Sequence, residues 1–468
     1  MTFVLREYQD ECVTTILNKF MEMNSQIVQL PTGAGKTVIL WNVLKSLNQK
    51  ALIVAPTREL TEQLEETGQS IVGEENVYLK KKSYWPKDRK YLVMTGQAST
   101  FAMKNGELFK FNPKVLVIDE AHRARSKNIE ALINEFKDRG ALVLGLTATP
   151  ERMDGKSLLE VFDELTYSKT LVDLIEQNFL VDLECYRITT KHKLKNYKLR
   201  GGDISPVSLS ELDVDSRNQI ILDVYKKYCM GKKTLIFCLN VNHAKKIANL
   251  LVDNGVKAMA IDGSMGRTTR RSILQMYKEG LIDVLCNCQL LTEGFDEPSI
   301  EALILARPTK SKALYCQMVG RGVRPYRGKT SCIVLDMSDE VHDICSFNVL
   351  GSIPSDTEFK FEDGERLTDA VERHKLGIND VDYDVERHYY YEPRGIDSVY
   401  ALQHQKEMLT MYNIPFLSDI TIDEAAYLLF KNALLEHYGC DKGMYWKKWR
   451  DVPCSSESEG CEEFESII

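Results

Sequence analysis

A glycine-rich turn between a predicted strand and a predicted helix constrains this 468-residue chain more than any other segment. The strand is expected at 27–30, and the turn 31–35 leads into a helix that begins with Lys36 and Thr37. Glycines in such a turn let backbone N–H groups wrap a phosphate, and the helix N-terminus favours negative charge. We expect Lys36 to reach the β- and γ-phosphates of a nucleotide and the Thr37 hydroxyl to bind Mg²⁺. The strict phosphate-loop pattern would have its first glycine at position 30, where this chain has leucine.

A second segment supplies the carboxylates that such a nucleotide site requires. The apolar run 115–118 predicts a strand that ends in Asp119 and Glu120. Asp119 is placed to hold Mg²⁺, usually through water, and Glu120 to orient or deprotonate an attacking water. A strand that merely ends in acidic residues is the alternative, but the combination with Lys36 and Thr37 favours a magnesium–nucleotide site.

Continuous apolar runs separated by helical stretches indicate parallel sheets that are covered on both faces. A first series of runs lies at residues 27–30, 51–55, 91–94, 115–118 and 141–144. A second series lies at residues 234–237, 258–261, 283–286, 302–305 and 332–335. Because the phosphate-loop pattern occurs only in the first series, the two halves are not a simple repeat. The sequence therefore predicts two α/β domains.

The expected domain boundaries follow from these runs and from shifts in composition. After about residue 346 the chain becomes polar and acidic, and residues 396–450 again show helical patterns. We expect a linker with a basic insertion between the two α/β domains and a small, mainly helical C-terminal accessory domain with an acidic tail. The predicted boundaries are 1–165, 166–215, 216–345 and 346–468.

The net charge of −8, taken alone, argues against binding to nucleic acid. However, the last fourteen residues hold five glutamates and no lysine or arginine, so the rest of the chain carries −3. Lys191, Lys193 and Lys195 alternate, and on a strand they would line one face as a phosphate track or as a wedge at a duplex junction. A solvated charged face is the competing interpretation of this cluster.

Apolar runs are shorter than the roughly 20 residues of a membrane span, and the N-terminus does not resemble a signal peptide. Several of the twelve cysteines lie inside apolar runs, which favours buried reduced thiols. We therefore expect a cytoplasmic protein, in the host cytoplasm if a phage encodes it, with no membrane partner. His437, Cys440, Cys454 and Cys461 have a loosely zinc-like order, but we interpret them as unrelated and do not expect zinc.

A series of segments between residues 3 and 340 resembles, in order, the motifs of superfamily 2 helicases and translocases of DEAH type. The segment 5–9 is similar to the adenine-binding Q motif, in which Arg6 and Gln9 would contact the base, and Asp119-Glu-Ala-His122 matches motif II. Motif I implies nucleotide contacts by Pro31, Thr32, Gly33, Ala34, Gly35, Lys36 and Thr37. His122 of motif II with Thr147 and Thr149 of motif III would couple hydrolysis to domain movement.

Other segments resemble motifs that face nucleic acid in this family. By this resemblance, Thr292 of motif V contacts the phosphate backbone, while Gly294 lies near the γ-phosphate and Asp296 near the ribose. The other nucleic-acid contacts that the resemblance implies are Pro56, Thr57 and Arg58 of motif Ia, Thr95, Gly96 and Gln97 of motif Ib, and Asn240 and His243 of motif IV.

Motif VI would complete the nucleotide site from the second domain. Gln317, Arg321 and Arg324 match its Q-x-x-G-R-G-x-R form, and the resemblance implies that both arginines act as arginine fingers. Guanidinium groups would offset the charge on the transferred phosphoryl group. The resemblance thus implies an α/β fold of two tandem RecA-like parallel-sheet lobes that bind ATP and Mg²⁺ between them, with nucleotide-dependent closure.

In form, the motifs look most like those of DNA-repair, recombination and phage-encoded DNA helicases of the XPB, RadD and UvsW-like groups. The resemblance implies an ATP-dependent DNA helicase, with 3′→5′ polarity as the family expectation, that unwinds or branch-migrates single-stranded, forked or four-way-junction DNA. We expect a monomer, with other replication and recombination proteins as candidate partners. A double-strand DNA translocase of a restriction-type system and an RNA helicase stay open as alternatives, although no nuclease constellation is evident in residues 346–468.

Overall fold

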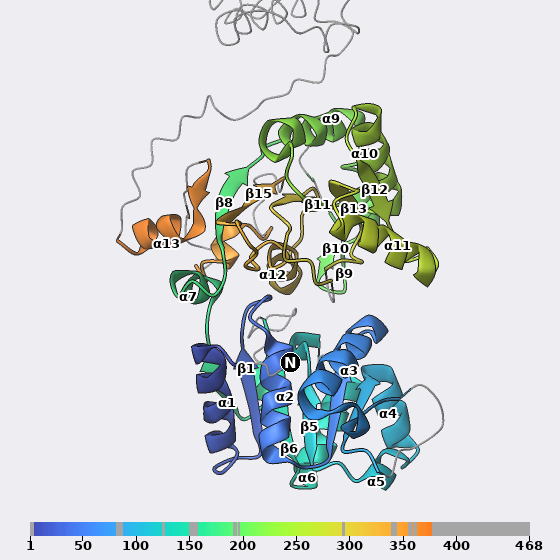
Figure 1. Ribbon diagram of the computed structural model, residues 1–468, viewed down its shortest axis with the longest axis vertical. Helices are drawn as coiled ribbons and strands as arrows, with labels where there is room; N and C mark the ends of the chain where they lie inside the picture. Colours follow the sequence, from blue (N-terminus) through green and yellow to red (C-terminus); the bar gives the residue numbers. More distant parts are fainter. Residues whose placement is uncertain are drawn as a thin grey trace, which may run out of the picture. The chain divides into compact units, whose positions relative to one another are not determined.

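The computed structural model has two lobes, each built around a sheet (Figure 1). The residues that it describes are 4–80, 88–123, 127–148, 158–190, 194, 197–292, 295–337, 344–353, 359 and 363–376. Across these ranges, no helix is long and apolar enough to cross a membrane.

Lobe 1 is a seven-stranded parallel sheet with the strand order β3-β4-β2-β5-β6-β1-β7. Its strands are β1 (Ser25–Gln29), β2 (Ala51–Ala55), β3 (Val77–Leu79), β4 (Tyr91–Thr95), β5 (Val115–Ile118), β6 (Leu142–Thr147) and β7 (Glu164–Ser168). Two sets of helices cover its two faces: α1 (Glu7–Lys19), α2 (Lys36–Leu47) and α3 (Arg58–Val72) on one, and α4 (Gly96–Lys104), α5 (Leu108–Phe111) and α6 (Lys127–Asp138) on the other.

Successive residues of the central strands alternate between the two hydrophobic cores of lobe 1. Ile53 and Val117 belong to the core beneath α1, α2 and α3, whereas Leu52 and Leu116 belong to the core beneath α4, α5 and α6. Burial on both faces explains why these strands are continuous apolar runs rather than alternating ones. The predicted α/β fold with a doubly covered parallel sheet is confirmed.

Lobe 2 is a second seven-stranded sheet, with the order β12-β13-β11-β14-β15-β8-β16. Its strands are β8 (Asp182–Arg187), β11 (Thr234–Phe237), β12 (Ala258–Ile261), β13 (Val284–Asn287), β14 (Ala302–Leu305), β15 (Ser331–Asp336) and β16 (Glu365–Arg366). All neighbours are parallel except β16, which runs antiparallel to β8. Its larger helices are α9 (Asp215–Val224), α10 (Val241–Asp253), α11 (Arg267–Lys278) and α12 (Lys312–Val319).

The strands depart from the expected domain boundaries in three places. β7 crosses the boundary expected at residue 165, and β8 is a member of the second sheet although its residues were assigned to the linker. β16 and the helix α13 (Leu367–Lys375) also pack on β8 rather than with an accessory domain. β8 lies between β15 and the short edge strand β16. Its sequence alternates polar and apolar residues, so it was not predicted as a strand. Residues 377–468, with the expected helical domain and acidic tail, lie outside the described residues.

Between β8 and α9 the chain forms a small subdomain on lobe 2. It contains a two-stranded hairpin of β9 (Leu199–Arg200) and β10 (Asp203–Ile204), followed by the short helix α8 (Pro206–Ser210). Ile204 and Leu209 pack with Leu194, Leu212 and Leu239 in a hydrophobic cluster of their own. The connector between the lobes contains α7 (Leu171–Glu176) and the residues that follow it.

Parallel strands bring their carboxyl ends, and the loops that follow them, to one edge of the lobe 1 sheet. β6 lies between β1 and β5, so the end of β6 adjoins both the phosphate loop and the two carboxylates after β5. The register pairs Gln29 with Thr147 and Ala55 with Thr95. The sheet order therefore gathers segments that are far apart in sequence, such as the ends of β1 at Gln29 and of β6 at Thr147, into one surface.

We predict that Gly145→Ala destabilises lobe 1. Gly145 lies in the interior strand β6, where a Cβ would stand 2.6 Å from Cζ of Phe162, a ring that is 1% exposed. Such overpacking costs about 1–3 kcal/mol, which the urea midpoint of unfolding measures. Gly263→Ala is the matched control, because a Cβ there meets nothing within 4 Å. Equal midpoints for both variants and the wild type would contradict the packing of β6.

Candidate functional site

The phosphate loop covers residues 30–35, between the end of β1 and the start of α2. The Leu30 N–H donates to the Thr147 carbonyl at 2.9 Å, and the Leu30 side chain is fully buried in the core of lobe 1. Burial therefore accounts for leucine where the strict pattern has glycine. Gly33 and Gly35 have φ angles of +92° and +75°, which glycine adopts without strain. The loop keeps the backbone shape that wraps a phosphate.

Lys36 opens α2, and its side chain turns back into the loop. Its Nζ donates to the Leu30 carbonyl at 3.1 Å and to the Pro31 carbonyl at 3.4 Å. The Thr32 hydroxyl is buried and has no hydrogen-bond partner among the described residues. A buried ammonium group, an unpartnered hydroxyl and a glycine-shaped loop fit the phosphates of ATP. Lys36 would hold the phosphates, and Thr37 at the helix start would hold Mg²⁺.

The start of α1 braces the phosphate loop from the side. Tyr8 Oη donates to the Ala34 carbonyl at 2.6 Å, and Gln9 Nε2 donates to the same carbonyl at 3.1 Å. Gln9 Oε1 accepts from the Arg6 N–H at 3.0 Å, so both ends of the Gln9 amide have protein partners. A Cβ at Gly35 would stand 2.6 Å from Gln9 Nε2. Gln9 thus fixes the loop, and its contact with adenine stays a prediction.

The connector between the lobes reaches the same region. The ring of Phe179 lies 4.7 Å from that of Tyr8, centroid to centroid, and the Phe179 carbonyl accepts from the Arg6 guanidinium at 3.1 Å. The Leu180 side chain lies 3.4 Å from the position of a Cβ at Gly33. The sequence pattern did not identify Tyr8 or Phe179 as site residues. Tyr8 stands inside the Q-like segment, whereas nothing near Phe179 in the sequence signals its role.

Motif II follows β5 directly. The Asp119 N–H donates to the Val54 carbonyl at 2.9 Å, and Asp119 Oδ1 accepts from the Glu120 N–H at 3.0 Å. Glu120 has a φ of +51°, a left-handed conformation that costs a non-glycine residue about 1–3 kcal/mol and that concentrates at functional sites. The two predicted catalytic carboxyl groups are therefore held at the sheet edge by their own backbone, with Asp119 as the candidate ligand for Mg²⁺.

His122 joins motif II to motif III. Its Nδ1 lies 3.3 Å from Glu120 Oε2 and 3.5 Å from Thr147 Oγ1, and the residue is 2% exposed. A movement of β6 would consequently change the surroundings of the Glu120 carboxyl group. The structure brings the predicted coupling residues His122 and Thr147 together, whereas Thr149 lies outside the described residues.

The two arginines that follow α12 have different surroundings. Arg321 donates to the Phe295 carbonyl at 2.5 Å and to the Thr292 carbonyl at 2.7 Å, and it is 5% exposed. Its guanidinium group therefore holds the loop of motif V. Both arginines are expected to be arginine fingers. These two bonds give Arg321 a positioning role in this structure, and its action as an arginine finger stays a prediction.

Arg324 lies against the phosphate loop. Its Cγ is 3.5 Å from the position of a Cβ at Gly33, and its guanidinium group forms an ion pair with Asp296. Burial lowers the pKa of Arg324, and the charge of Asp296 opposes this shift. Nearby, a Cβ at Gly320 would stand 2.3 Å from Cβ of Thr32, so motif VI and motif I touch without a gap. This geometry makes Arg324 the candidate arginine finger.

Three other predicted residues lie in or beside these motifs. Gln317 on α12 is 2% exposed, and its Nε2 has no hydrogen-bond partner among the described residues. Thr292 is 5% exposed, and its hydroxyl donates to the Gln289 carbonyl at 2.7 Å, so its contact with a phosphate backbone stays a prediction. Gly294 lies outside the described residues.

On lobe 1, the two motifs expected to bind nucleic acid start neighbouring helices. Thr57 caps the N-terminus of α3 by accepting from the Leu60 N–H at 3.2 Å, next to Pro56 and the exposed Arg58. Thr95 caps α4 in the same way, with Gly96 and the exposed Gln97 following it. Because β2 and β4 are paired, the two helix starts lie side by side. Their free N–H groups and helix dipoles favour phosphate groups.

On lobe 2, the two residues of motif IV that were expected to bind nucleic acid have different surroundings. Asn240 caps α10, as its Oδ1 accepts from the His243 N–H at 2.9 Å. His243, however, is fully buried: its Nδ1 accepts from the Leu239 N–H at 3.2 Å, and its Nε2 lies 2.9 Å from Asn218 Oδ1. Both ring nitrogens are used inside the lobe, so His243 orders the start of α10, and its contact with nucleic acid stays a prediction.

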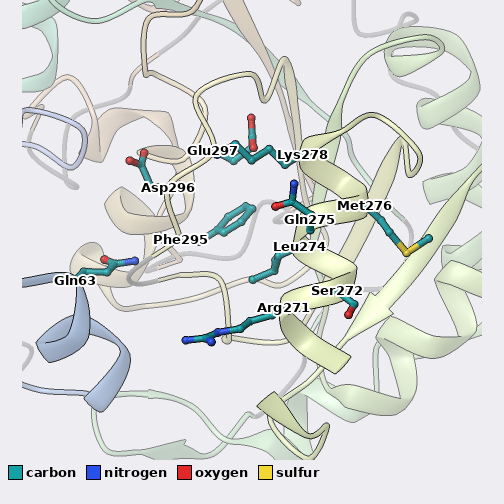
Figure 2. Close-up of a pocket in the computed structure, with 10 residues that line it drawn as sticks. All are labelled: Gln63, Arg271, Ser272, Leu274, Gln275, Met276, Lys278, Phe295, Asp296 and Glu297. Atoms are coloured by element: carbon teal, nitrogen blue, oxygen red, sulfur yellow. The ribbon is translucent and has the colours of Figure 1, made fainter. Parts of the chain in front are cut away.

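A cavity of about 750 Å³ lies between α3, α11 and the loop of motif V. Figure 2 shows Phe295 beside Leu274 in this cavity, with Gln63 of α3 on the other side. Next to it, Arg267 and Arg270 of α11 lie 3.5 Å from Glu62 and 3.7 Å from Glu59 of α3. These partly exposed pairs are weak in free energy, about 0–1 kcal/mol each, so they leave the lobes free to move.

Some predicted residues cannot be placed. Lys191, Lys193 and Lys195 lie outside the described residues, as do His437, Cys440, Cys454 and Cys461. In the part of the chain that is described, no group of three or more His, Cys, Asp or Glu side chains is arranged to hold a metal ion. The nine cysteines in that part are all free thiols.

Comparison with known protein families identifies both lobes. Residues 2–152 match the family described as "Type III restriction enzyme, res subunit", and residues 216–326 match the "Helicase conserved C-terminal domain". The fold is similar to that of Saccharomyces cerevisiae Dbp5 bound to RNA and ADP BeF3, with a TM-score of 0.52 at 15% identity over 74% of this chain and 86% of that chain. The chain therefore belongs to the superfamily 2 helicases and has their two-lobed fold.

Three relatives are each similar to this chain over about two thirds of its length or more. IRC3 of Saccharomyces cerevisiae, provisionally named an ATP-dependent helicase, is 29% identical over 76% of this chain and 55% of its own length. A Schizosaccharomyces pombe protein, provisionally named a mitochondrial ATP-dependent helicase, is 31% identical over 73% and 58%. The ATP-dependent DNA helicase uvsW of phage T4 is 26% identical over 67% and 65%. The chain thus spans less than two thirds of each relative.

We predict that Gly35→Ala weakens ATP binding at least tenfold. The new Cβ would stand 2.6 Å from Gln9 Nε2 at a φ of +75°, so the loop and its brace must both shift. Equilibrium binding of a fluorescent ATP analogue measures the change. Gly106→Ala is the control, because it imposes similar strain at a φ of +67° where a Cβ meets nothing within 4 Å. If both variants bind ATP as the wild type does, the bracing of the loop by Gln9 is refuted.

Proposed function

We propose that this chain is an ATP-dependent DNA helicase that moves along DNA and unwinds or branch-migrates forked and junction DNA. The observation that carries the proposal is the contact between motif VI and the phosphate loop, in which Arg324 lies against Gly33. One lobe thereby supplies the loop that binds phosphates and the other supplies a guanidinium group beside it. A nucleotide between them can join hydrolysis to lobe movement.

The chemistry is the attack of water on the γ-phosphorus of ATP, with ADP as the leaving group. Lys36 and the loop N–H groups would hold the phosphates, while Thr37 and Asp119 would hold Mg²⁺. When bound, Mg²⁺ neutralises part of the negative charge on the phosphates. Glu120 would orient the water and take its proton. Arg324 would stabilise the charge that spreads over the transferred phosphoryl group, and its ion pair with Asp296 keeps it positioned.

Movement along a DNA strand requires two binding sites whose separation changes. The neighbouring helix starts at Thr57 and Thr95 would form one site on lobe 1, and the motif V loop would form the other on lobe 2. Arg321 donates to two carbonyl groups of that loop, so a change at motif VI would be transmitted directly to the second site. His122 and Thr147 would carry the same change across lobe 1.

DNA is the proposed substrate because the motif forms resemble those of DNA helicases and because uvsW, a relative, is named as an ATP-dependent DNA helicase. The 3′→5′ direction, the preference for forks or four-way junctions, and a role in replication, recombination or repair are parts of this proposal. We further propose a cytoplasmic monomer, with other replication or recombination proteins as partners. The free thiols support a reducing compartment.

Two alternatives each have a specific observation in their favour. The family matched by residues 2–152 is named after a restriction enzyme subunit, which favours a translocase of double-stranded DNA. The structure of Dbp5 with a similar fold is bound to RNA, which keeps an RNA helicase in consideration. These alternatives differ from the main proposal in the nucleic acid that stimulates hydrolysis.

Steady-state ATP hydrolysis in the presence of different nucleic acids tests the proposal. Single-stranded, forked and four-way-junction DNA should each stimulate the full chain more than blunt duplex DNA or RNA does. Stimulation by duplex DNA alone would support the restriction-type translocase. Stimulation by RNA and not by DNA would reject the DNA helicase.

We predict that Lys36→Ala abolishes ATP hydrolysis while DNA binding persists. The variant loses the ammonium group that sits inside the phosphate loop, but the helix starts of motifs Ia and Ib are untouched. Hydrolysis should fall by at least a hundredfold, and the Kd for single-stranded DNA should stay within about threefold of the wild type. Lys114→Ala, at an exposed position before β5, is the control for loss of one positive charge. Residual hydrolysis near the wild-type rate would place the nucleotide elsewhere.

A further inference from the structure

The β9–β10 hairpin presents an exposed edge that is basic and apolar. Lys198, Leu199 and Arg200 are all exposed, Leu199 to 56%, and residues 197–202 include no acidic side chain. Gly201 and Gly202 form the turn with φ angles of +65° and +89°. A two-stranded hairpin is marginally stable in water when isolated, so this one needs an anchor on lobe 2.

Asp203 of β10 provides the anchor. Its Oδ2 accepts from the Arg307 guanidinium at 2.9 Å, and its Oδ1 accepts from the Thr309 hydroxyl at 2.8 Å and the Lys310 N–H at 2.9 Å. Asp203 is 8% exposed and Arg307 is 5% exposed. Such a buried pair is costly to break, because the remaining partner would be left as an uncompensated charge.

On its other side, Arg307 leads to motif V. In the amide orientation that turns its oxygen toward the guanidinium group, Gln289 accepts from Arg307 at 3.0 Å. The Gln289 carbonyl accepts from the Thr292 hydroxyl at 2.7 Å, and the Thr292 carbonyl accepts from Arg321 at 2.7 Å. A continuous polar chain thus runs from Asp203 in the hairpin, through motif V, to motif VI.

The hairpin subdomain is also joined to motif IV. Helix α8, which follows β10, ends at Ser210, and its hydroxyl accepts from Asn240 Nδ2 at 3.3 Å. Ile204 and Leu209 pack with Leu239, the residue just before Asn240. Figure 1 shows β9 and β10 at the margin of lobe 2. The hairpin is therefore connected to both lobe 2 motifs, IV and V, for which a nucleic-acid contact is expected.

We propose that the β9–β10 hairpin is an additional binding element for the DNA strand and that Asp203 is the positioning residue that ties it to motif V. This inference rests on the proposed function. Lys198 and Arg200 bind backbone phosphates, and Leu199 offers an apolar surface to a base. When motif V shifts during the ATP cycle, Arg307 shifts with it and carries the hairpin along.

Equilibrium binding of the full chain to a single-stranded DNA oligonucleotide, measured over a range of salt concentrations, tests the contact. The variant Lys198→Ala/Arg200→Ala loses two phosphate partners, so its Kd should rise about tenfold at low salt. The slope of log K against log salt should become shallower by about 1.4, or about 0.7 for each lost phosphate contact. Both residues are exposed, so folding should not change.

The matched control is Lys114→Ala/Lys257→Ala. It removes the same charge from two exposed lysines that precede β5 and β12, at the amino ends of the strands. Its salt slope should equal that of the wild type. An unchanged slope in the hairpin variant, with the wild type binding normally, overturns the hairpin contact alone. A wild-type chain that does not bind single-stranded DNA contradicts the proposed function itself.

Asp203→Asn tests the positioning role. It should raise the DNA concentration for half-maximal ATP hydrolysis by about the same factor as the hairpin variant, with the KM for ATP unchanged. Combining it with Lys198→Ala/Arg200→Ala should add no further loss, because an unanchored hairpin no longer places its cations. Additive losses in the combined variant would show that Asp203 acts only on stability and would overturn its positioning role.

Discussion

The close contact between the phosphate loop and motif VI is the constraint on which the rest of this structure depends. A Cβ at Gly320 of motif VI would stand 2.3 Å from Cβ of Thr32 in the loop, so glycine is required at that position. Gly33 and Gly35 have left-handed φ angles that a larger residue adopts only with strain. Arg324 of lobe 2 lies against Gly33 of this loop. A small change in phosphate charge at this point is therefore felt by both lobes.

From this contact the interactions spread outward through buried polar groups. Arg321 fixes the loop of motif V by two carbonyl groups, and Thr292 in that loop continues the chain toward Gln289. In lobe 1, His122 connects the carboxyl group of Glu120 with Thr147 at the end of β6. Such groups lose their partners if one of them moves alone, so the network favours concerted shifts over independent ones. The weak ion pairs between α3 and α11 oppose such shifts little.

The sequence allowed the local parts of this site to be predicted, because their signals are short and continuous. The loop before Lys36 and the two acids after β5 are each a run of a few residues, and each apolar run is four or five residues long. The α/β fold that they predict is confirmed. Long-range contacts were not predictable. The place of Phe179 beside Tyr8 depends on how the connector folds, and the burial of His243 depends on Asn218 in another helix. Strand β8 was missed because its sequence alternates polar and apolar residues rather than forming a continuous apolar run.

In the proposed mechanism, Arg324 stabilises the phosphoryl group during hydrolysis. The most direct test is the kcat of DNA-stimulated ATP hydrolysis by an Arg324→Ala variant, measured with ATP at saturation. We expect kcat to fall about a thousandfold, as for loss of an arginine finger, because lobe 2 no longer brings the Arg324 guanidinium group to the loop. A kcat equal to that of the wild type would contradict a nucleotide site shared by the two lobes.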